Sequence, residues 1–555
     1  MERIEALLAK HVVQAIKELF GADISESMVQ IQRTRKEFEG DFTVVTFPFI
    51  KAARKSPEET GRLLGEALLS LDEVSGFNVV KGFLNLSIVD SWWLDFLNST
   101  LSEPTWGFGK KGSQPQVMVE YSSPNTNKPL HLGHLRNNFL GYSVARILEA
   151  VGHDVVKVQI INDRGIHICK SMVAWQQFGE GETPQSNGVK GDHLVGKYYV
   201  QFETAYKKEI KELMAAGMAE DDAKKQAPIM LAARETLQKW EAKDPDTIAL
   251  WEKMNSWVYA GFEQTYQEMG VSFDKLYYES QTYLTGKDVI AKGLEQGVFS
   301  QREDGSVWCD LTDDGLDEKL LLRSDGTAVY MTQDVGTAML RFTDYPNLSH
   351  QLYTVGNEQE YHFKVLFLIL KKLGFEKAAN NYHLSYGMVE LPEGKMKSRE
   401  GTVVDADELL SEMAATAQEI TDELGKLEGM DETDRSDLFK TLGYGALKYF
   451  LLKVDPRKSM MFDPKESIDF NGNTGPYIQF NYVRTRSILR RYESEVPKSI
   501  DINTPINESE RSLIKMIYEF PTVLEEAAKD YNPAVIANYS YGLVREYSSF
   551  YQVNP

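Results

Sequence analysis

The residues His131, Leu132, Gly133 and His134 could bind a phosphate group. An apolar, β-branched run at 117–121 predicts a buried strand, Pro124 breaks it, and apolar residues at helical spacing follow from 135 to 150. Backbone N–H groups at a helix start favour an anion, and two imidazoles one turn apart can donate hydrogen bonds to phosphate oxygens. On spacing alone, structural histidines or a metal-binding pair fit these residues equally well.

A second candidate is the basic loop at 391–402, which reads LPEGKMKSREGT. It carries Lys395, Lys397 and Arg399 between two glycines. Clustered cations favour contact with a polyanion, and glycines at both ends favour a mobile loop. Taken alone, the same residues would also suit a solvated surface loop.

Composition narrows the class of protein. A chain of 555 residues exceeds what one hydrophobic core supports, so we expect roughly three or four domains. The first helix is amphipathic rather than a signal peptide, and no apolar run is long enough to span a bilayer. The two cysteines, Cys169 and Cys309, lack paired CxxC spacing, which argues against disulfides and zinc knuckles. We expect a cytoplasmic protein with no membrane partner and no metal site of its own.

The charge distribution allows a local RNA-binding surface. The net charge of −21 argues against non-specific binding of nucleic acid over the whole surface. Residues 401–440 contain 3 Lys and Arg against 12 Asp and Glu, whereas residues 441–500 contain 10 against 6. The sign of the charge therefore reverses between neighbouring segments, and the later segment can face a polyanion.

The order of elements predicts a multidomain α/β protein. Residues 1–112 form an α+β domain with an alternating stretch at 42–49, and a linker rich in glycine and proline follows at 104–115. A strand–helix–strand pattern then begins a Rossmann-type parallel sheet, interrupted by a charged helical insertion at about 180–280. Strands at 328–332 and 352–356 and a helix at 363–373 are expected to resume it. After 436 the chain is helical.

Two apparent nucleotide motifs fail on context. Gly107, Gly109 and Gly112 match GxGxxG, but they precede a strand instead of following one. Residues 191–197, GDHLVGK, imitate a P-loop, yet Tyr198 stands where a Ser or Thr must meet magnesium and no strand precedes them. Neither stretch is taken as a binding site.

The His131–His134 motif after a strand, with a Lys-Met loop far downstream, resembles the two signatures of class I aminoacyl-tRNA synthetases. The stretch SSPNTNKPLHLGH resembles the arginyl enzymes in particular. The resemblance implies an N-terminal domain for the tRNA elbow (1–112), a catalytic domain with its Lys-Met loop at 394–402 (113–435), and an all-α anticodon-binding domain (436–555). The chain stops soon after a helical segment, where such enzymes continue, so we expect a truncated last domain.

The resemblance also implies the reaction and its site. Arginine would be activated by ATP, with Mg²⁺, and transferred to tRNA(Arg) by a monomer. The implied ATP-binding residues are His131, Gly133, His134, Lys395, Met396, Lys397 and Ser398. The implied arginine-binding residues are Glu120, Asn125, Tyr330, Asp334 and Gln359. Carboxylates suit this ligand because a guanidinium presents five donors in a rigid fork.

Three further expectations depend on the resemblance. The second lysine of the usual loop is displaced here, and Lys128, just before the histidine motif, would supply its charge. The tRNA would contact Arg484, Arg486, Tyr477 and Tyr482, where cations and aromatic rings occur together. Another class I synthetase, an HxGH nucleotidylyltransferase and a non-catalytic tRNA-binding regulator are the alternative interpretations; His131, His134 and Lys395 argue against the regulator.

Overall fold

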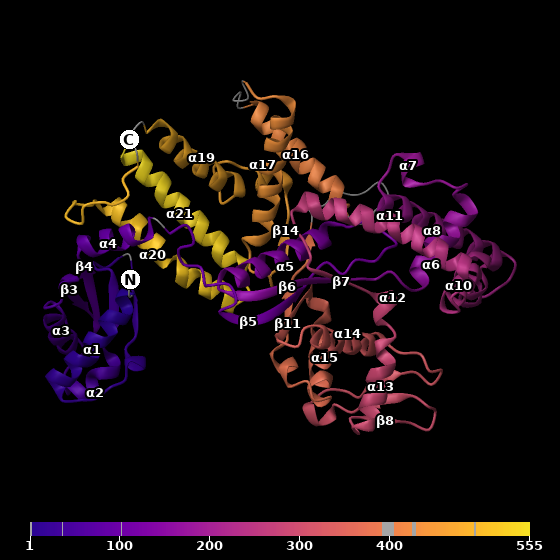
Figure 1. Ribbon diagram of the computed structural model, residues 1–555, viewed down its shortest axis with the longest axis horizontal. Helices are drawn as coiled ribbons and strands as arrows, with labels where there is room; N and C mark the ends of the chain where they lie inside the picture. Colours follow the sequence, from indigo (N-terminus) through magenta and orange to yellow (C-terminus); the bar gives the residue numbers. More distant parts are fainter. Residues whose placement is uncertain are drawn as a thin grey trace. The chain divides into compact units, whose positions relative to one another are not determined.

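The computed structural model describes residues 3–554 apart from 36, 102, 391–403, 424–428 and 493–495, and it leaves out the side chain of 287. The chain forms two compact units, whose elements Figure 1 shows in sequence colours. The small unit comprises Met1–Gly107, Arg484–Thr522 and Gly542–Pro555. The large unit comprises Phe108–Val483 and Val523–Tyr541.

The small unit contains an α+β fold, as the sequence predicts. Helix α1 (Ile4–Phe20) shares a hydrophobic core with an antiparallel sheet of strand order β1-β2-β4-β3. The strands are β1 (Ile31–Arg33), β2 (Phe42–Val45), β3 (Val74–Val80) and β4 (Phe83–Ile88), with helices α3 (Pro57–Leu68) and α4 (Asp90–Thr100). Strand β2 is shorter than the alternation at 42–49 suggests, because Pro48 lacks an N–H and the chain turns into a 3-10 helix at Phe47–Phe49.

Tyr518 of helix α20 (Glu508–Lys529) completes the core of the small unit. Its ring makes edge-on contacts with Trp92, Trp93 and Phe96 at centroid distances of 5.5, 5.7 and 5.1 Å. Its hydroxyl accepts a hydrogen bond from the backbone N–H of Ile4 at 3.1 Å, across a sequence separation of 514 residues. The first helix of the chain is therefore anchored by a residue close to the chain's other end.

The large unit is built on a parallel sheet of strand order β12-β11-β5-β6-β7, which confirms the predicted fold class. Its strands are β5 (Gln114–Glu120), β6 (His153–Ile161), β7 (Lys275–Tyr278), β11 (Leu348–Gly356) and β12 (Tyr382–Tyr386). Glu120, the last residue of β5, lies beside Val158 of β6 and Tyr353 of β11. The loops after β5 and β11 therefore leave the same carboxyl edge, where ligands bind in such sheets.

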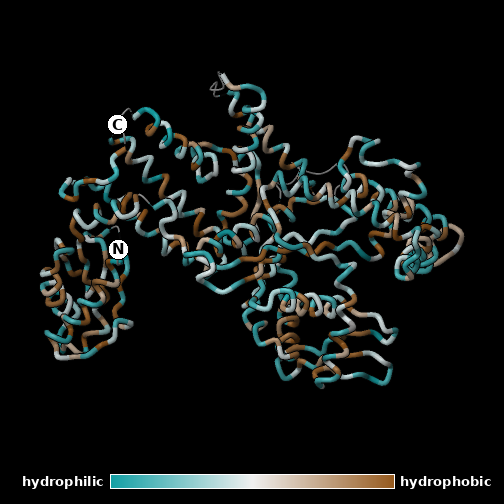
Figure 2. The backbone as a smooth tube through the Cα atoms, in the orientation of Figure 1, coloured by the Kyte–Doolittle hydropathy of each residue, from teal (hydrophilic) through white to brown (hydrophobic). Residues whose placement is uncertain are grey.

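Helices pack around the parallel sheet and make up most of the rest of the large unit. Helix α5 (Leu132–Ala150) packs on the sheet, and the predicted insertion is helical. Its main helices are α6 (Ile166–Phe178), α8 (Gly191–Ala215), α10 (Pro228–Glu241) and α11 (Pro245–Met269). Figure 2 shows hydrophilic and hydrophobic residues alternating along them, as expected for amphipathic helices that bury one face. Residues 191–197 begin α8, so the P-loop resemblance is correctly rejected.

One predicted strand is wrong. Residues 328–332 lead into helix α14 (Tyr330–Asp344), with Val329 as its N-cap residue. Buried Met331, Val335 and Ala338 follow at helical spacing, so the short apolar run belongs to a helix face; a run of this length cannot distinguish the two structures. Tyr330 and Asp334 therefore lie on successive turns of a helix. Between 299 and 322 the chain forms a separate antiparallel sheet, β8 (Phe299–Gln301), β9 (Val307–Cys309) and β10 (Lys319–Leu322).

The chain after 436 is mostly helical, as predicted, with the later part of α17 (Glu432–Leu452) followed by α19 (Gly475–Arg491), α20 and α21 (Pro533–Val553). Two more helices precede this segment, α15 (Glu360–Lys372) and α16 (Ala406–Glu423). Of the helices formed by described residues, none is both long enough and apolar enough to cross a bilayer.

Candidate active site

His131 and His134 form a reciprocal cap at the start of α5. His131 Nδ1 accepts a hydrogen bond from the backbone N–H of Gly133 at 3.1 Å, and His134 Nδ1 accepts one from the backbone N–H of His131 at 3.1 Å. The two ring centroids are 3.9 Å apart. Because each Nδ1 is an acceptor, the proton of each neutral ring must lie on Nε2.

The surroundings keep both rings neutral. Burial, helped by the charge of Lys128, lowers the pKa of His131 to about 4. Burial also holds the pKa of His134 well below its ordinary value, with smaller contributions from His131 and Lys128. Near pH 7 each histidine is therefore an uncharged Nε2–H donor. Such a donor can stabilise a phosphate oxygen on which charge develops, without needing to lose or gain a proton.

These histidines line a cavity of about 470 Å³ at the carboxyl edge of the sheet, here called the histidine pocket. Ser122 and Ser123 from the turn after β5, the backbone of 354–356 from the end of β11, and Tyr386 complete much of its lining. Asn137 of α5 fixes this edge, since its Oδ1 accepts the Ser122 N–H at 2.6 Å and its Nδ2 donates to the Thr354 carbonyl at 2.6 Å.

The backbone of the turn after β5 is strained where it lines this pocket. Ser122 and Ser123 have φ values of 82° and 41°, a left-handed region that side chains other than glycine rarely adopt. Hydrogen bonding of the Ser122 N–H to Asn137 helps to hold this conformation. Strain of this kind persists where the surroundings over-determine it and is common at functional sites.

A second cavity of about 470 Å³, here called the aspartate pocket, contains Asn125, Tyr330 and Asp334. Asp334 Oδ2 lies 2.7 Å from Nε2 of His362, and Tyr330 is 77% exposed. Both side chains project from the first turns of α14, so the corrected secondary structure still brings them together. Gln359 ends a short 3-10 helix at Asn357–Gln359, is exposed, and is not among the residues that line either pocket.

Glu279 also lines the aspartate pocket, and sequence reasoning missed it. It follows β7 at the same carboxyl edge of the sheet, and this position after a strand is the signal that could have identified it. Burial raises its pKa to about 7, although the charge of Arg164 opposes this shift. With Asp334 it gives the pocket two carboxyl groups, one of which readily gains or loses a proton near neutral pH.

Glu120 has a partner within the protein. Its carboxylate forms an ion pair with Arg341 of α14, and both residues are buried, with 7% and 1% of their surfaces exposed. The Ser123 hydroxyl donates to the other carboxylate oxygen at 3.3 Å. Glu120 therefore already binds a guanidinium, and its contact with a substrate remains a prediction.

The basic loop at 391–402 lies outside the described residues. Lys395, Met396, Lys397 and Ser398, together with Arg399, belong to the segment 391–403, about which the structure gives no description. Val389 and Val404, on either side of it, line the histidine pocket. Val404 also accepts a hydrogen bond from the Leu132 N–H at 3.0 Å, so the chain rejoins the structure beside the histidine motif.

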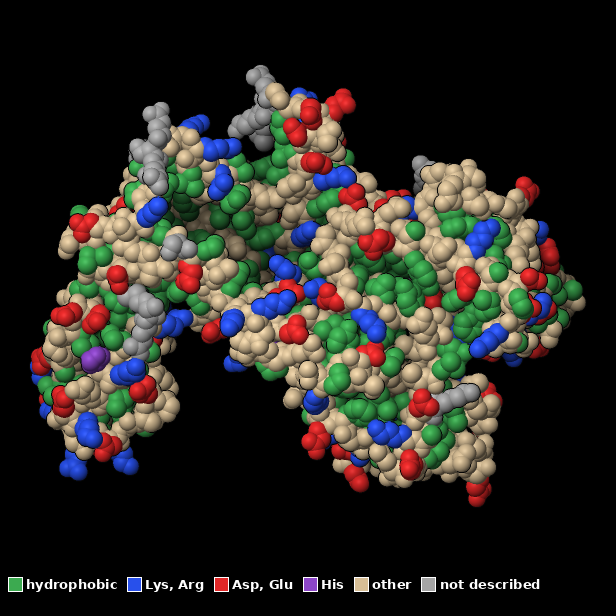
Figure 3. Space-filling view, viewed as in Figure 1, with side chains coloured by type: hydrophobic (Ala, Val, Ile, Leu, Met, Phe, Trp, Pro, Cys, Tyr) green, Lys and Arg blue, Asp and Glu red, His purple; other side chains and the backbone are tan. Residues whose placement is uncertain are grey.

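The residues predicted to contact tRNA lie along helix α19. The Tyr477 ring packs against Tyr541 at a centroid distance of 5.8 Å, whereas Tyr482 is 63% exposed. The Arg484 guanidinium lies 4.9 Å from the ring centroid of Tyr551, and Arg486 is part of the same helix. Figure 3 shows Lys and Arg side chains gathered over this helix.

Three family models together cover nearly the whole chain. One described as "tRNA synthetases class I (R), catalytic domain" matches residues 97–463. "Arginyl tRNA synthetase N terminal domain" matches 6–88, and "DALR anticodon binding domain" matches 478–555. The parallel sheet with a histidine pair at its carboxyl edge thus belongs to a class I aminoacyl-tRNA synthetase.

Comparison with individual relatives shows to which family of class I synthetases the chain belongs. The chain is 56% identical to the arginine–tRNA ligase of Bacteroides thetaiotaomicron over 554 residues, covering 99% of this chain and 93% of that one. It is 57% identical to that of Parabacteroides distasonis over 553 residues, covering 99% and 92%. The chain belongs to the arginine–tRNA ligase family, which confirms the resemblance seen in the sequence.

Two solved structures support the fold. The Thermus thermophilus arginyl-tRNA synthetase matches with a TM-score of 0.76 at 24% identity, covering 99% of this chain and 92% of that chain. The Plasmodium falciparum enzyme matches with a TM-score of 0.74 at 20% identity, covering 100% and 92%. At these identities the likeness concerns the fold alone.

Proposed function

We propose that the histidine pocket binds ATP and the aspartate pocket binds arginine in this arginine–tRNA ligase, which activates arginine and transfers it to tRNA(Arg). The observation that carries this proposal is the pair of neutral Nε2–H donors at the start of α5, in a cavity at the carboxyl edge of a parallel sheet. Class I synthetases use ATP, so a phosphate-stabilising site of this kind is required.

The first step is attack of the arginine carboxylate on the α-phosphorus, which forms arginyl-adenylate and expels pyrophosphate. Reactions of this type depend mainly on positioning and on stabilising charge at the phosphate oxygens. His131 and His134 would donate to those oxygens, and the N-terminus of α5 adds a favourable dipole. In the second step a ribose hydroxyl of the tRNA attacks the arginyl carbonyl and AMP leaves. Neither step requires a nucleophilic side chain.

Arginine selection is assigned to the aspartate pocket. Asp334 and Glu279 would share the guanidinium, with Tyr330 beside it, because two carboxylates match its fork of donors. Asn125 and Gln359 are proposed near the α-amino and carboxylate end, and Glu120 in support of them. Lysine lacks the fork and would leave acceptors unsatisfied, which costs about 1–3 kcal/mol for each such group.

Several finer assignments form part of the same proposal. Lys128 supplies positive charge beside the two histidines, and Lys395, Met396, Lys397 and Ser398 contact the triphosphate. Mg²⁺ arrives with ATP and is held mainly by its phosphates. The tRNA contacts α19 through Arg484, Arg486, Tyr477 and Tyr482, and the enzyme acts as a cytoplasmic monomer. The 1–112, 113–435 and 436–555 domain boundaries remain predictions.

The direct test is arginine-dependent exchange between ATP and pyrophosphate, with and without tRNA(Arg), using lysine as the control amino acid. We expect exchange only with arginine plus tRNA. Asp334→Asn should raise the KM for arginine with little effect on the KM for ATP. His134→Ala should instead lower the maximal rate of exchange between ATP and pyrophosphate. Asp288→Asn, which changes an exposed carboxylate on a neighbouring helix, is the matched control. Retained tRNA binding without any exchange would instead indicate a regulator.

A further inference from the structure

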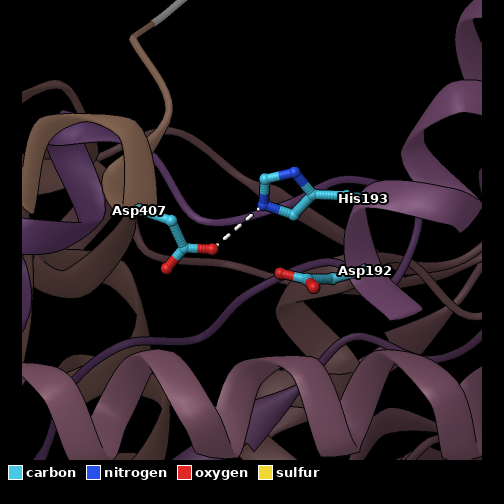
Figure 4. Close-up of side chains that lie close together, drawn as sticks. All are labelled: Asp192, His193 and Asp407. Carbon is cyan, nitrogen blue, oxygen red and sulfur yellow. Dashed lines mark hydrogen bonds and ion pairs between the residues drawn. The ribbon is translucent and has the colours of Figure 1, made fainter. Parts of the chain in front are cut away.

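A cluster of charged side chains joins the start of α8 to the start of α16, outside the lining of both pockets. Asp192 and His193 come from α8, Asp407 comes from α16, and Figure 4 shows the three side chains turned toward one another. Lys190, the N-cap residue of α8, lies among them. Of these residues, Asp192 and His193 belong to the stretch 191–197, whose sequence imitates a P-loop but which forms the start of helix α8.

The spacing within the cluster approaches that of metal ligands. Nε2 of His193 lies 3.0 Å from Oδ2 of Asp407 and 3.5 Å from Oδ2 of Asp405. One ligand atom each from Asp192, His193 and Asp407 lies within 4.8 Å of the others. Ligands held at about 2.0–2.2 Å from a zinc ion lie up to about 4 Å apart, so a small side-chain rotation would complete the arrangement.

Asp192 is the residue of the cluster whose polar atoms are least satisfied. Its side chain is fully buried, and neither carboxylate oxygen has a hydrogen-bond partner among the residues that the structure describes. Gly261 of α11 leaves room for it, because a Cβ there would lie 2.2 Å from Asp192 Oδ1. Lys190 Nζ, at 3.5 Å, is the nearest cation. A buried carboxylate without hydrogen bonds is costly unless a cation binds it.

Lys190 can leave the cluster. Its ammonium contacts Asp407 and lies 2.6 Å from the Thr265 hydroxyl. Lys190, Thr265 and Asp407 all line a cavity of about 1070 Å³ formed by residues of α11, α16 and α17. The lysine side chain can therefore swing into this cavity, and the same cavity gives an ion a route to the carboxylates.

We propose that Asp192, His193 and Asp407 bind a divalent transition metal ion of the zinc type, which takes the place of the Lys190 ammonium. One imidazole nitrogen with two carboxylate oxygens is a donor set that zinc accepts, and Asp405 or water can supply the fourth ligand. The sequence predicts no metal site, because His193 and Asp407 are far apart in the chain and only folding brings them together.

The ion would stabilise the neighbourhood of the histidine pocket. Asp407 is the second residue of α16, which begins at Ala406, and the Ala406 N–H donates to the Leu130 carbonyl at 3.0 Å. Leu130 lies one residue before His131, so an ion that fixes α16 to α8 also fixes this connection. Its role is structural, and it takes no part in the reaction at phosphorus.

The test is a metal titration of the full chain after dialysis against a chelator. Binding of Zn²⁺ is followed by competition with a chromophoric chelator, and Co²⁺ is followed by its absorption spectrum. We expect one ion per wild-type chain, at least about tenfold weaker binding in Asp192→Asn and His193→Gln, and tighter binding in Lys190→Met, which lacks the competing ammonium. Asp288→Asn should bind as wild type does.

The opposite results would overturn the proposal. Equal Zn²⁺ affinity in wild type and Asp192→Asn would place the ion elsewhere. Absence of stoichiometric binding in both wild type and Lys190→Met would mean that the ammonium is the permanent cation of the cluster. Because Lys190→Met keeps all three ligands, it decides the question even if Asp192→Asn fails to fold, which circular dichroism would reveal.

Discussion

Replacing Arg341 with methionine should strongly destabilise the central sheet. Arg341 is 1% exposed and forms an ion pair with Glu120 at the end of β5. Methionine fills much of the volume but leaves a buried carboxylate without its cation, and breaking such a pair costs about 3–5 kcal/mol. The guanidinium also lies 5.0 and 5.7 Å from the ring centroids of Tyr277 and Tyr353, contacts worth about 0.5–2 kcal/mol each that methionine replaces only in part.

Hydrogen exchange of the amides in β5 and β11 is the suitable assay, because a protein of two units does not give a single unfolding free energy. In Arg341→Met the free energy of opening that protects these amides should fall by about 3–5 kcal/mol. Adding Glu120→Gln should restore part of it, since the double variant no longer buries a charge. Arg146→Met is the control, because its side chain on α5 is 64% exposed.

Two results would refute this reasoning. A loss below about 1 kcal/mol in Arg341→Met would mean that Glu120 reaches water or another cation, as exposed pairs do. Additive losses in the double variant would mean that the two side chains do not depend on each other. Either result would also mean that the Glu120 carboxylate is not held by Arg341 and is available to bind substrate arginine.

Three other predictions concern the two pockets. Burial raises the pKa of the Glu279 carboxyl group to about 7, and a bound guanidinium favours its ionised form, so the affinity for arginine should increase from pH 6 to 8 and binding should release a proton. Calorimetry in buffers of different ionisation enthalpy measures this proton release. Glu279→Gln should show neither the pH dependence nor the proton release. The pKa of His131 in the folded protein, about 4, lies below its ordinary value of 6.5, so the stability that its neutral ring contributes is complete above pH 6.5 and is lost as the pH falls toward 4. Thermal unfolding of His131→Gln should therefore show a smaller loss of stability than wild type between pH 6.5 and 4. The same dependence of stability on pH in both proteins would mean that the ring is not buried as described. Lys128→Ala and Lys395→Ala should each slow pyrophosphate exchange, by comparable factors of about 10²–10³, and a rate near wild type in Lys128→Ala would remove Lys128 from the site.

Local patterns were sufficient for much of the fold. The strand at 117–121 and the helix after His131 follow from apolar spacing and a proline break, and both are confirmed as β5 and α5. The strand predicted at 328–332 is wrong because its apolar residues also fit a helix, and only their packing decides between the two. In the same way, the tautomers of His131 and His134 depend on backbone geometry that residue types do not encode.

Long-range pairings could not be predicted from the sequence. Arg341 pairs with Glu120, and His193 meets Asp407, across separations that no local pattern describes. Glu279 joins Asp334 because β7 and α14 meet at one edge of the sheet. Each of these residues has an ordinary context in the chain, and its chemistry arises only from what burial places beside it.

The anchoring of Ile4 by Tyr518 has a consequence for synthesis on the ribosome. The two residues are separated by 514 positions, and translation at roughly 5–20 residues per second takes about 25–100 s to cover them. During that time helix α4 lacks the ring of Tyr518, which in the folded protein packs against its Trp92, Trp93 and Phe96. The nascent chain therefore carries an incompletely covered aromatic surface through most of its elongation. We expect chaperones that bind apolar surfaces to be found on ribosomes that translate this message.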